Sequence, residues 1–329
     1  MVIQSSKESL PRAPKPRGEN APLLGDTLVR QIAATWWKQY QESDKFGRDR
    51  AMPELPIRAS SVSKRCDRAL WYELTGTVKS NPSDAAGVFR MMLGQQVHDL
   101  VDKAMEALPG WQGVDEEGRK HGWYVEETVD LQPIGLAGSA HGDLTHYTNG
   151  VCDIVGEIKT EGGFGFKVKT TNFKGPPEGP RWAHVMQAAL VAVALNAPTI
   201  SVMYFALESV SPDLAASMGA DEFSRFTAQW DFNTDDWRRA VEIEVNRQMR
   251  ILELARANYR PERSLSEPDI PGGATVIDAE KGKWVVQSAQ DGRVTNAGST
   301  WMCGYCDWQA QCVADGADAV QLAMPTVKS

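Results

Sequence analysis

Four of the five cysteines in this 329-residue chain are spaced in a way that restricts how it can fold. Cys303, Cys306 and Cys312 lie close together in WMCGYCDWQAQC, whereas Cys66 lies far upstream in KRCDRALWYE. Thiols stay reduced in the cytoplasm, so clustered cysteines there favour a metal centre over disulfides. A four-thiolate centre built from both ends would tie the chain together, and it would contain an iron–sulfur cluster or zinc.

The composition suits one elaborated α/β domain, since hydrophobic residues make up 42% of the chain. No run of eighteen apolar residues is present, which argues against a membrane span. Residues 1–18 lack the apolar stretch of a secretory signal, so we expect a cytoplasmic protein. The net charge of −8 argues mildly against a nucleic-acid partner, although residues 58–68 and 159–181 are each locally basic.

Periodicity and turn signals divide the chain into helices and strands. Helices are predicted at 26–43, 61–76, 84–107, 181–196 and 234–259, the last with Thr234 as its N-cap. Strands are predicted at 123–131, 136–148, 151–160 and 199–207, with a small hairpin around Trp284 and Val294. The remaining connections include a Gly-, Lys- and Pro-rich mobile loop at 161–180 and an irregular segment at 211–233.

The predicted domain organisation is a single domain between two polar ends. Residues 1–24 are expected to form a disordered or loosely docked arm, and 313–329 a polar tail. The domain at 25–312 divides into a core at about 84–207, a helical and irregular insertion at about 208–300, and a clasp made by Cys66 with 303–312.

Asn149-Gly150 lies between two apolar alternating segments and predicts a tight hairpin, because both residues tolerate positive φ. Asp143 and Glu157 lie at near-symmetric positions on either side of this turn, so the hairpin brings them together. Two such carboxylates repel unless a hard divalent cation binds between them. Lys159 shares a strand face with Glu157, where its ammonium can act on a water or a phosphate.

His98, on the predicted helix at 84–107, can add a nitrogen ligand, which favours Mn²⁺ alongside Mg²⁺. Three segments then match, in order, the motifs of the RecB-like branch of the PD-(D/E)XK nucleases: GQQVH (94–98), HGD (141–143) and EIK (157–159). The cysteine pattern resembles the iron–sulfur subgroup of that branch, which includes CRISPR-associated protein four and the AddB nuclease domain. The resemblance spans roughly residues 61–312, although 208–300 has no matching motif.

This resemblance implies a restriction-endonuclease-like α/β fold: a mixed sheet flanked by helices, with helical elaborations and a four-cysteine [4Fe–4S] clasp. It implies metal-dependent hydrolysis of DNA, and an exonuclease in recombination, end processing or phage DNA metabolism. The implied metal ligands are His98, Asp143, Glu157 and the Ile158 carbonyl, with Lys159 as the catalytic lysine. Gln187 matches the start of the family's QxxxY motif, but Val191 stands where its tyrosine is expected.

Each part of the pattern also has an ordinary structural explanation. An ExK on a strand is commonly a solvated charge pair, and a histidine on an amphipathic helix commonly packs in the core. We interpret His141, His146 and His184 as structural or DNA-facing, and Cys152 as a small buried hydrophobe. Three tryptophans are candidates for stacking on bases but are more typical of a core: Trp71, Trp123 and Trp182.

Two other functions stay open at this point. The chain would be a binding module if its nuclease core were inactive, or it would be a structure-specific endonuclease. Zinc also stays open for the cysteine centre, although zinc sites often contain two CxxC pairs and this chain has one. Expected partners are DNA ends or single strands, a second copy of the chain, or a helicase or annealing protein.

Overall fold

The structure is a computed structural model. It describes residues 31–32, 34–35, 38, 57–64, 66–80, 85–109, 111–171, 177–208, 226–261, 274–278, 283–287, 294–296 and 306–315. Those described between 31 and 38 are helical, in agreement with the helix predicted at 26–43. The predicted arm at 1–24, Cys303 and nearly all of the predicted tail lie outside the described residues.

Six strands of the described chain form one mixed sheet, in the order β1-β2-β3-β4-β5-β6. Neighbouring strands are antiparallel, except that β4 and β5 are parallel. The strands are β1 (Gln112–Val114), β2 (Lys120–Asp130), β3 (Ser139–Thr148), β4 (Val151–Glu161), β5 (Thr199–Ala206) and β6 (Thr227–Asn233). The fold is therefore α/β with a mixed sheet, as expected from the sequence.

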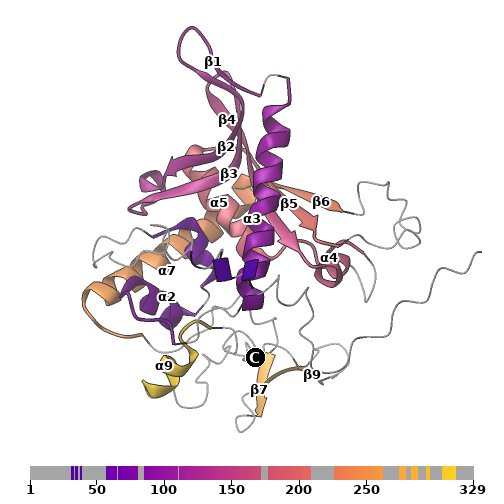
Figure 1. Cartoon of the computed structure of the whole chain (residues 1–329). Coiled ribbons are helices and arrows are strands. Elements are labelled where there is room, and N and C mark those ends of the chain that lie inside the picture. The colour runs from indigo at the N-terminus through magenta and orange to yellow at the C-terminus, as the bar shows by residue number, and fades with distance from the viewer. Residues whose placement is uncertain are drawn as a thin grey trace, which may run out of the picture.

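Helices cover both faces of this sheet (Figure 1). In that view α3 (Ala85–Glu106) crosses in front, and α5 (Trp182–Leu195) lies behind and packs on β4 and β5. The helix α7 (Arg238–Arg256) packs against α5. The shorter helices are η2 (Ala59–Ser63), α2 (Asp67–Leu74), η3 (Gln132–Ile134), α4 (Gly163–Thr170), η5 (Thr234–Trp237) and α9 (Gln309–Ala314). The parallel β4–β5 pair requires a crossover connection, and α4 and α5 supply it.

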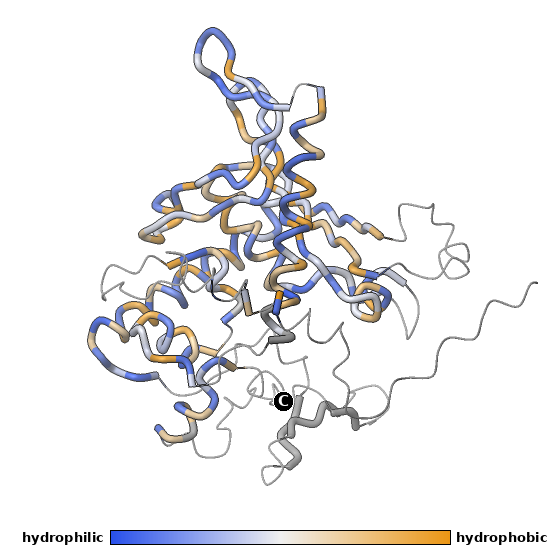
Figure 2. The backbone as a smooth tube through the Cα atoms, viewed as in Figure 1, coloured by the Kyte–Doolittle hydropathy of each residue, from blue (hydrophilic) through white to orange (hydrophobic). Residues whose placement is uncertain are grey.

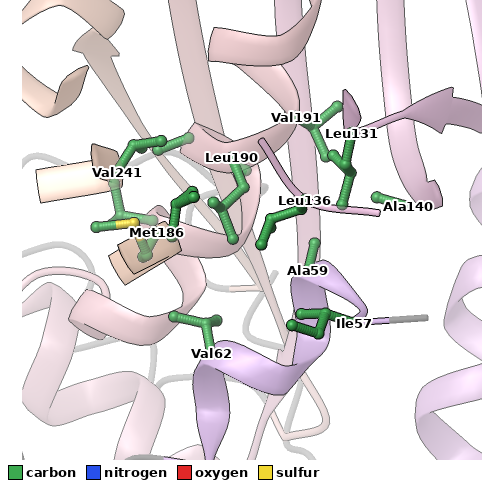
Figure 3. Close-up of a cluster of buried hydrophobic side chains, with 14 of the residues drawn as sticks. Ile57, Ala59, Val62, Leu131, Leu136, Ala140, Met186, Leu190, Val191 and Val241 are labelled. Atoms are coloured by element: carbon green, nitrogen blue, oxygen red, sulfur yellow. The ribbon is translucent and has the colours of Figure 1, made fainter. Parts of the chain in front are cut away.

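The main hydrophobic core lies around α5. Met186, Leu190 and Val191 of α5 meet side chains from η2 and from the connection after β2, including Val62 and Leu136 (Figure 3). Hydrophobic colour is nearly continuous along α5, whereas it alternates with hydrophilic colour along α3 (Figure 2). A helix that is apolar on all sides is buried, and an amphipathic one keeps a face toward solvent. The sequence pattern thus explains why α5 is internal and α3 is peripheral.

The Asn149-Gly150 turn forms as predicted, with φ of 52° at Asn149 and 82° at Gly150. Near the turn Thr148 pairs with Val151, but after a register shift His146 pairs with Ile154. This shift is a β-bulge at Asp153, whose carboxylate accepts hydrogen bonds from Thr148 Oγ1 (2.7 Å) and lies 2.6 Å from His146 Nδ1. The bulge therefore moves every later residue of β4 by one position relative to β3.

A small second sheet contains β7 (Ala274–Asp278), β8 (Lys283–Gln287) and β9 (Val294–Asn296). Its β8 and β9 are the two segments predicted as a hairpin around Trp284 and Val294, and β7 adds a third strand to them.

Three local expectations were wrong. The segment 161–180 was predicted as a loop, but it contains α4, because Phe166 is fully buried and Thr170 donates its hydroxyl to the Phe166 carbonyl. The segment 211–233 was predicted as irregular, but it ends in β6, which pairs with β5. The sheet therefore extends past residue 207, where the core was predicted to end. Thr234 does not cap the long helix. It begins η5, where Asn233 accepts from the Asp235 N–H.

Candidate active site

The candidate site lies where β3 and β4 separate. Their last recorded pair is Leu144 with Gly156, and the next position in that register places Asp143 opposite Glu157. Because of the bulge at Asp153, it is Glu157 rather than Gly156 that stands opposite Asp143. The Asp143 Oδ2 accepts a hydrogen bond from the Ile158 N–H at 2.7 Å, so a side-chain oxygen takes the place of a main-chain carbonyl.

Lys159 lies between these two carboxylates. Its ammonium forms an ion pair with Glu157 Oε1 and lies 4.0 Å from Asp143 Oδ2. The Glu157 side chain is 3% exposed and that of Asp143 is 9% exposed, whereas Lys159 keeps 22% of its side-chain surface. Of the three, the lysine therefore has the most access to an approaching molecule.

His98 reaches the same place from α3. It lies one helical turn after Gly94, and a Cβ at Gly94 would lie 3.3 Å from Thr160 Oγ1 of β4. That separation is tighter than most Cβ contacts, so the absence of a side chain lets α3 approach β4 closely. The His98 ring then lies beside the Asp143 carboxylate, with ligand atoms of the two residues within 4.8 Å.

Burial changes the acid–base chemistry of this group. Removal from water raises the pKa of Glu157 to about 8 and also raises the pKa of Asp143. Burial disfavours the charge on Lys159, but Glu157 and Asp143 outweigh it and raise the pKa of that ammonium. The pKa of His98 is raised mainly by the neighbouring Glu126 carboxylate. The raised pKa values of Glu157 and Asp143 mean that burial disfavours their ionised forms, which a bound positive charge would stabilise.

Glu126 is a neighbour that the sequence reasoning missed. His98 Nδ1 lies 3.7 Å from Glu126 Oε1. In the described part of the chain, His98, Glu126 and Asp143 form the group of possible metal ligands whose atoms all lie within 4.8 Å of one another. The predicted ligand Glu157 is outside this group, and its carboxylate contacts Lys159. The signal for Glu126 was the pairing of β2 with β3, which no local turn reveals.

The motif that follows on α5 is only partly reproduced. Gln187 is half-buried, and its side chain has no hydrogen-bond partner among the described residues. Val191, where the tyrosine was expected, is buried, with its Cγ1 3.5 Å from the Cβ position of Gly142. Val191 therefore packs on β3 at Gly142.

A different tyrosine lies beside the catalytic candidate. Tyr204 of β5 is paired in register with Lys159. Its hydroxyl accepts from the Arg181 N–H at 3.1 Å and lies 2.6 Å from His184 Nδ1. Burial lowers the pKa of His184 to about 3, so this ring is neutral and has a structural role beside Tyr204.

The segments that contain the predicted cysteine ligands pack together. Cys66 is the N-cap of α2, and Cys312 lies in α9 with its Sγ 3.8 Å from an Arg68 nitrogen. Between these helices Tyr72 stacks on Trp308, with ring centroids 6.1 Å apart, and the Trp308 indole donates to the Thr77 carbonyl. Cys66, Cys306 and Cys312 are all partly buried against the core.

The three described thiols are not all within 4.8 Å of one another. By contrast, Cys152 is 3% exposed, and burial raises the pKa of its thiol to about 12, so it behaves as a small hydrophobe.

The basic stretches are partly neutralised by acids. Lys169 is buried and pairs with Glu161 at 2.9 Å, and Arg181 lies 3.4 Å from the same carboxylate. Of the tryptophans considered for base stacking, Trp71 is buried in the core, and Trp123 packs on His146 with centroids 4.8 Å apart. No helix among the described residues is long and apolar enough to cross a bilayer.

Comparisons with known proteins add little to this geometry. No protein-family model matches the sequence, and no curated protein matches it. Among solved structures, the crystal structure of SSO0001 aligns with 89% of this chain and 98% of its own, at 14% identity and a TM-score of 0.42. Because that similarity is weak, the functional conclusion depends on the site itself.

Proposed function

We propose that this chain is a divalent-metal-dependent DNA nuclease with a PD-(D/E)XK core. The observation that carries the proposal is the convergence of Asp143, Glu157 and Lys159 where β3 and β4 separate, with His98 beside them. Sheet positions far from any tight turn rarely collect two buried carboxylates and a lysine without a chemical reason, because burial of charge is costly. A nuclease of this type needs that set.

The residues divide the work between them. His98, Asp143 and Glu157, with the Ile158 carbonyl, are the proposed ligands, and a divalent cation there supplies a lowered pKa for the attacking water and charge neutralisation at the phosphate. Lys159, which is the most exposed of the buried trio, holds its ammonium toward the phosphate and the water. Asp143 also accepts from Ile158 N–H, which fixes the carboxylate before metal binds. Its position is thus set by the fold.

The contact between α2 and α9 supports a second part of the proposal, a [4Fe–4S] clasp. Cys66, Cys303, Cys306 and Cys312 would hold the cluster, which would join the segment before the nuclease core to the segment after it. Its role is structural, because Arg68, Tyr72 and Trp308 already dock these segments on each other. Zinc in its place would give a colourless protein, so metal analysis and visible absorption of anaerobically purified protein separate the two.

The proposal is tested by cleavage of end-labelled linear single-stranded DNA with Mn²⁺ or Mg²⁺, beside the Asp143→Asn variant. Asparagine keeps an oxygen that accepts from the Ile158 N–H and removes only the ionised ligand, so the variant should fold. We expect metal-dependent degradation by the natural protein and at least a hundredfold loss in the variant. Folded, cluster-loaded protein without cleavage would contradict the proposal and favour a binding module.

Exonuclease action is the more specific part of the proposal, and it comes from the resemblance of the motifs. Circular single-stranded DNA of the same sequence provides the comparison, because it offers no end. Degradation of the linear form alone supports an exonuclease, whereas equal degradation of both forms identifies an endonuclease.

A further inference from the structure

Glu126 stands directly across from Asp143 in the sheet. Val125 pairs with Leu144, and Glu127 pairs with Gly142. In the same register Glu126 lies opposite Asp143. Glu126 has a φ of 47°, which interrupts the regular alternation of β2. The two consecutive glutamates have different partners.

Glu127 is fully engaged away from the site. It forms an ion pair with Lys120 and accepts hydrogen bonds from Thr145 Oγ1 and from the Tyr147 hydroxyl. Glu126 instead lies next to His98, whose Nδ1 is 3.7 Å from Glu126 Oε1, and its side chain is 47% exposed. Of the two, only Glu126 is placed to bind something that enters from solvent.

Asp143 has two sets of neighbours. Its Oδ2 accepts from the Ile158 N–H and faces Lys159, which also holds Glu157. His98 and Glu126 supply the other neighbours, with ligand atoms within 4.8 Å of Asp143 and of each other. A nitrogen and two carboxylates at this spacing can converge on one divalent cation.

We propose that Glu126 is a ligand of the divalent cation, added on the His98 side of Asp143 to the ligands named above. This inference rests on the proposed nuclease function, because the cation site in question is the proposed active site. Charge supports it: Glu126 and Asp143 bring two carboxylates to one place, and a divalent cation bound between them offsets their mutual repulsion. A mixed nitrogen and carboxylate set selects Mn²⁺ over Mg²⁺.

The test is Mn²⁺ binding by titration calorimetry to the natural protein, the Glu126→Gln variant and a matched control, Glu116→Gln. Glu116 is exposed in the turn between β1 and β2, away from the site. We expect Glu126→Gln to weaken Mn²⁺ binding about tenfold or more and the control to leave it unchanged. We also expect Glu126→Gln to reduce the rise in Tm caused by Mn²⁺ without lowering the metal-free Tm, because the variant relieves repulsion between carboxylates.

Two results would overturn the inference. One is equal Mn²⁺ affinity in Glu126→Gln and the natural protein. The other is a lower metal-free Tm in the variant with an unchanged Mn²⁺-induced shift, which would mean that Glu126 only supports His98 structurally. DNA cleavage measured on the same samples separates this inference from the proposed function. If Mn²⁺ binding depends on Glu126 but the natural protein does not cleave DNA, Glu126 is a metal ligand and the proposed nuclease function is wrong. If the natural protein cleaves DNA but Glu126→Gln binds Mn²⁺ as tightly, the nuclease function stands and Glu126 is not a ligand.

Discussion

At the scale of single residues, the site is defined by charges that the fold places out of water. Glu157 and Lys159 are two apart on β4 and meet as an ion pair, which the alternation of a strand predicts from sequence. The hydrogen bond from Ile158 N–H to Asp143 was not predictable, because it exists only where β3 and β4 cease to pair. Glu126 was missed for a related reason, since its position depends on a pairing with no local turn signal.

Glu157 should make the stability of the metal-free protein depend on pH. Burial raises its pKa from an ordinary 4.5 to about 8, so the folded protein keeps a proton that the unfolded chain releases. This contribution to stability is fully present below the unfolded pKa and is lost as pH rises toward 8. Glu157→Gln removes the titration, so its Tm relative to the natural protein should rise by a few degrees between about pH 5 and pH 8.

The measurement is thermal unfolding of both proteins in chelator across that pH range. The difference between the two Tm values cancels the titrating groups that are remote from Glu157, whereas His98 and Asp143 interact with Glu157 and titrate together with it. A difference that stays constant with pH would mean that the Glu157 carboxyl ionises as freely in the fold as in water.

At the scale of elements, the predictable parts are those with a local cause. The β3–β4 hairpin follows from Asn149-Gly150, and α5 follows from a mostly apolar segment that ends at Asn196 in the left-handed conformation. No sequence signal predicts the bulge at Asp153. The bulge adds one residue to β4 relative to β3, and this extra residue brings Glu157 opposite Asp143. The helix α4 was missed because its glycines indicate a loop, whereas burial of Phe166 stabilises a helix.

The contact between α2 and α9 gives a prediction at this scale. The buried Tyr72 donates its hydroxyl to Asp315 Oδ2 at 2.7 Å, so Tyr72→Phe should lower the free energy of unfolding by about 1–2 kcal/mol. Tyr259→Phe is the control, because Tyr259 is 67% exposed. Urea unfolding of the two variants provides the comparison, and equal stabilities would show that the two helices do not depend on this contact.

At the scale of the whole molecule, segments far apart in sequence converge in two places. The sheet and α3 gather the candidate active site from residues between 98 and 159, and α2 and α9 bring Arg68 to 3.8 Å from the Cys312 Sγ. The composition and the mixture of predicted helices and strands indicated the α/β class, which the structure shows as a mixed sheet flanked by helices. The position of α9 against α2 followed only from the idea that four cysteines share one centre, since nothing else in the sequence links residues so distant.

The most direct test of the central claim is single-turnover cleavage of linear single-stranded DNA in Mn²⁺ by the natural protein, Lys159→Met and Lys169→Met, with DNA affinity measured on each. Lys169 is the control, since it is a nearby buried lysine paired with Glu161. We predict that Lys159→Met loses about a hundredfold or more in cleavage rate at unchanged DNA affinity, because its ammonium acts on the reacting phosphate and water. Cleavage by Lys159→Met at the natural rate would contradict the account.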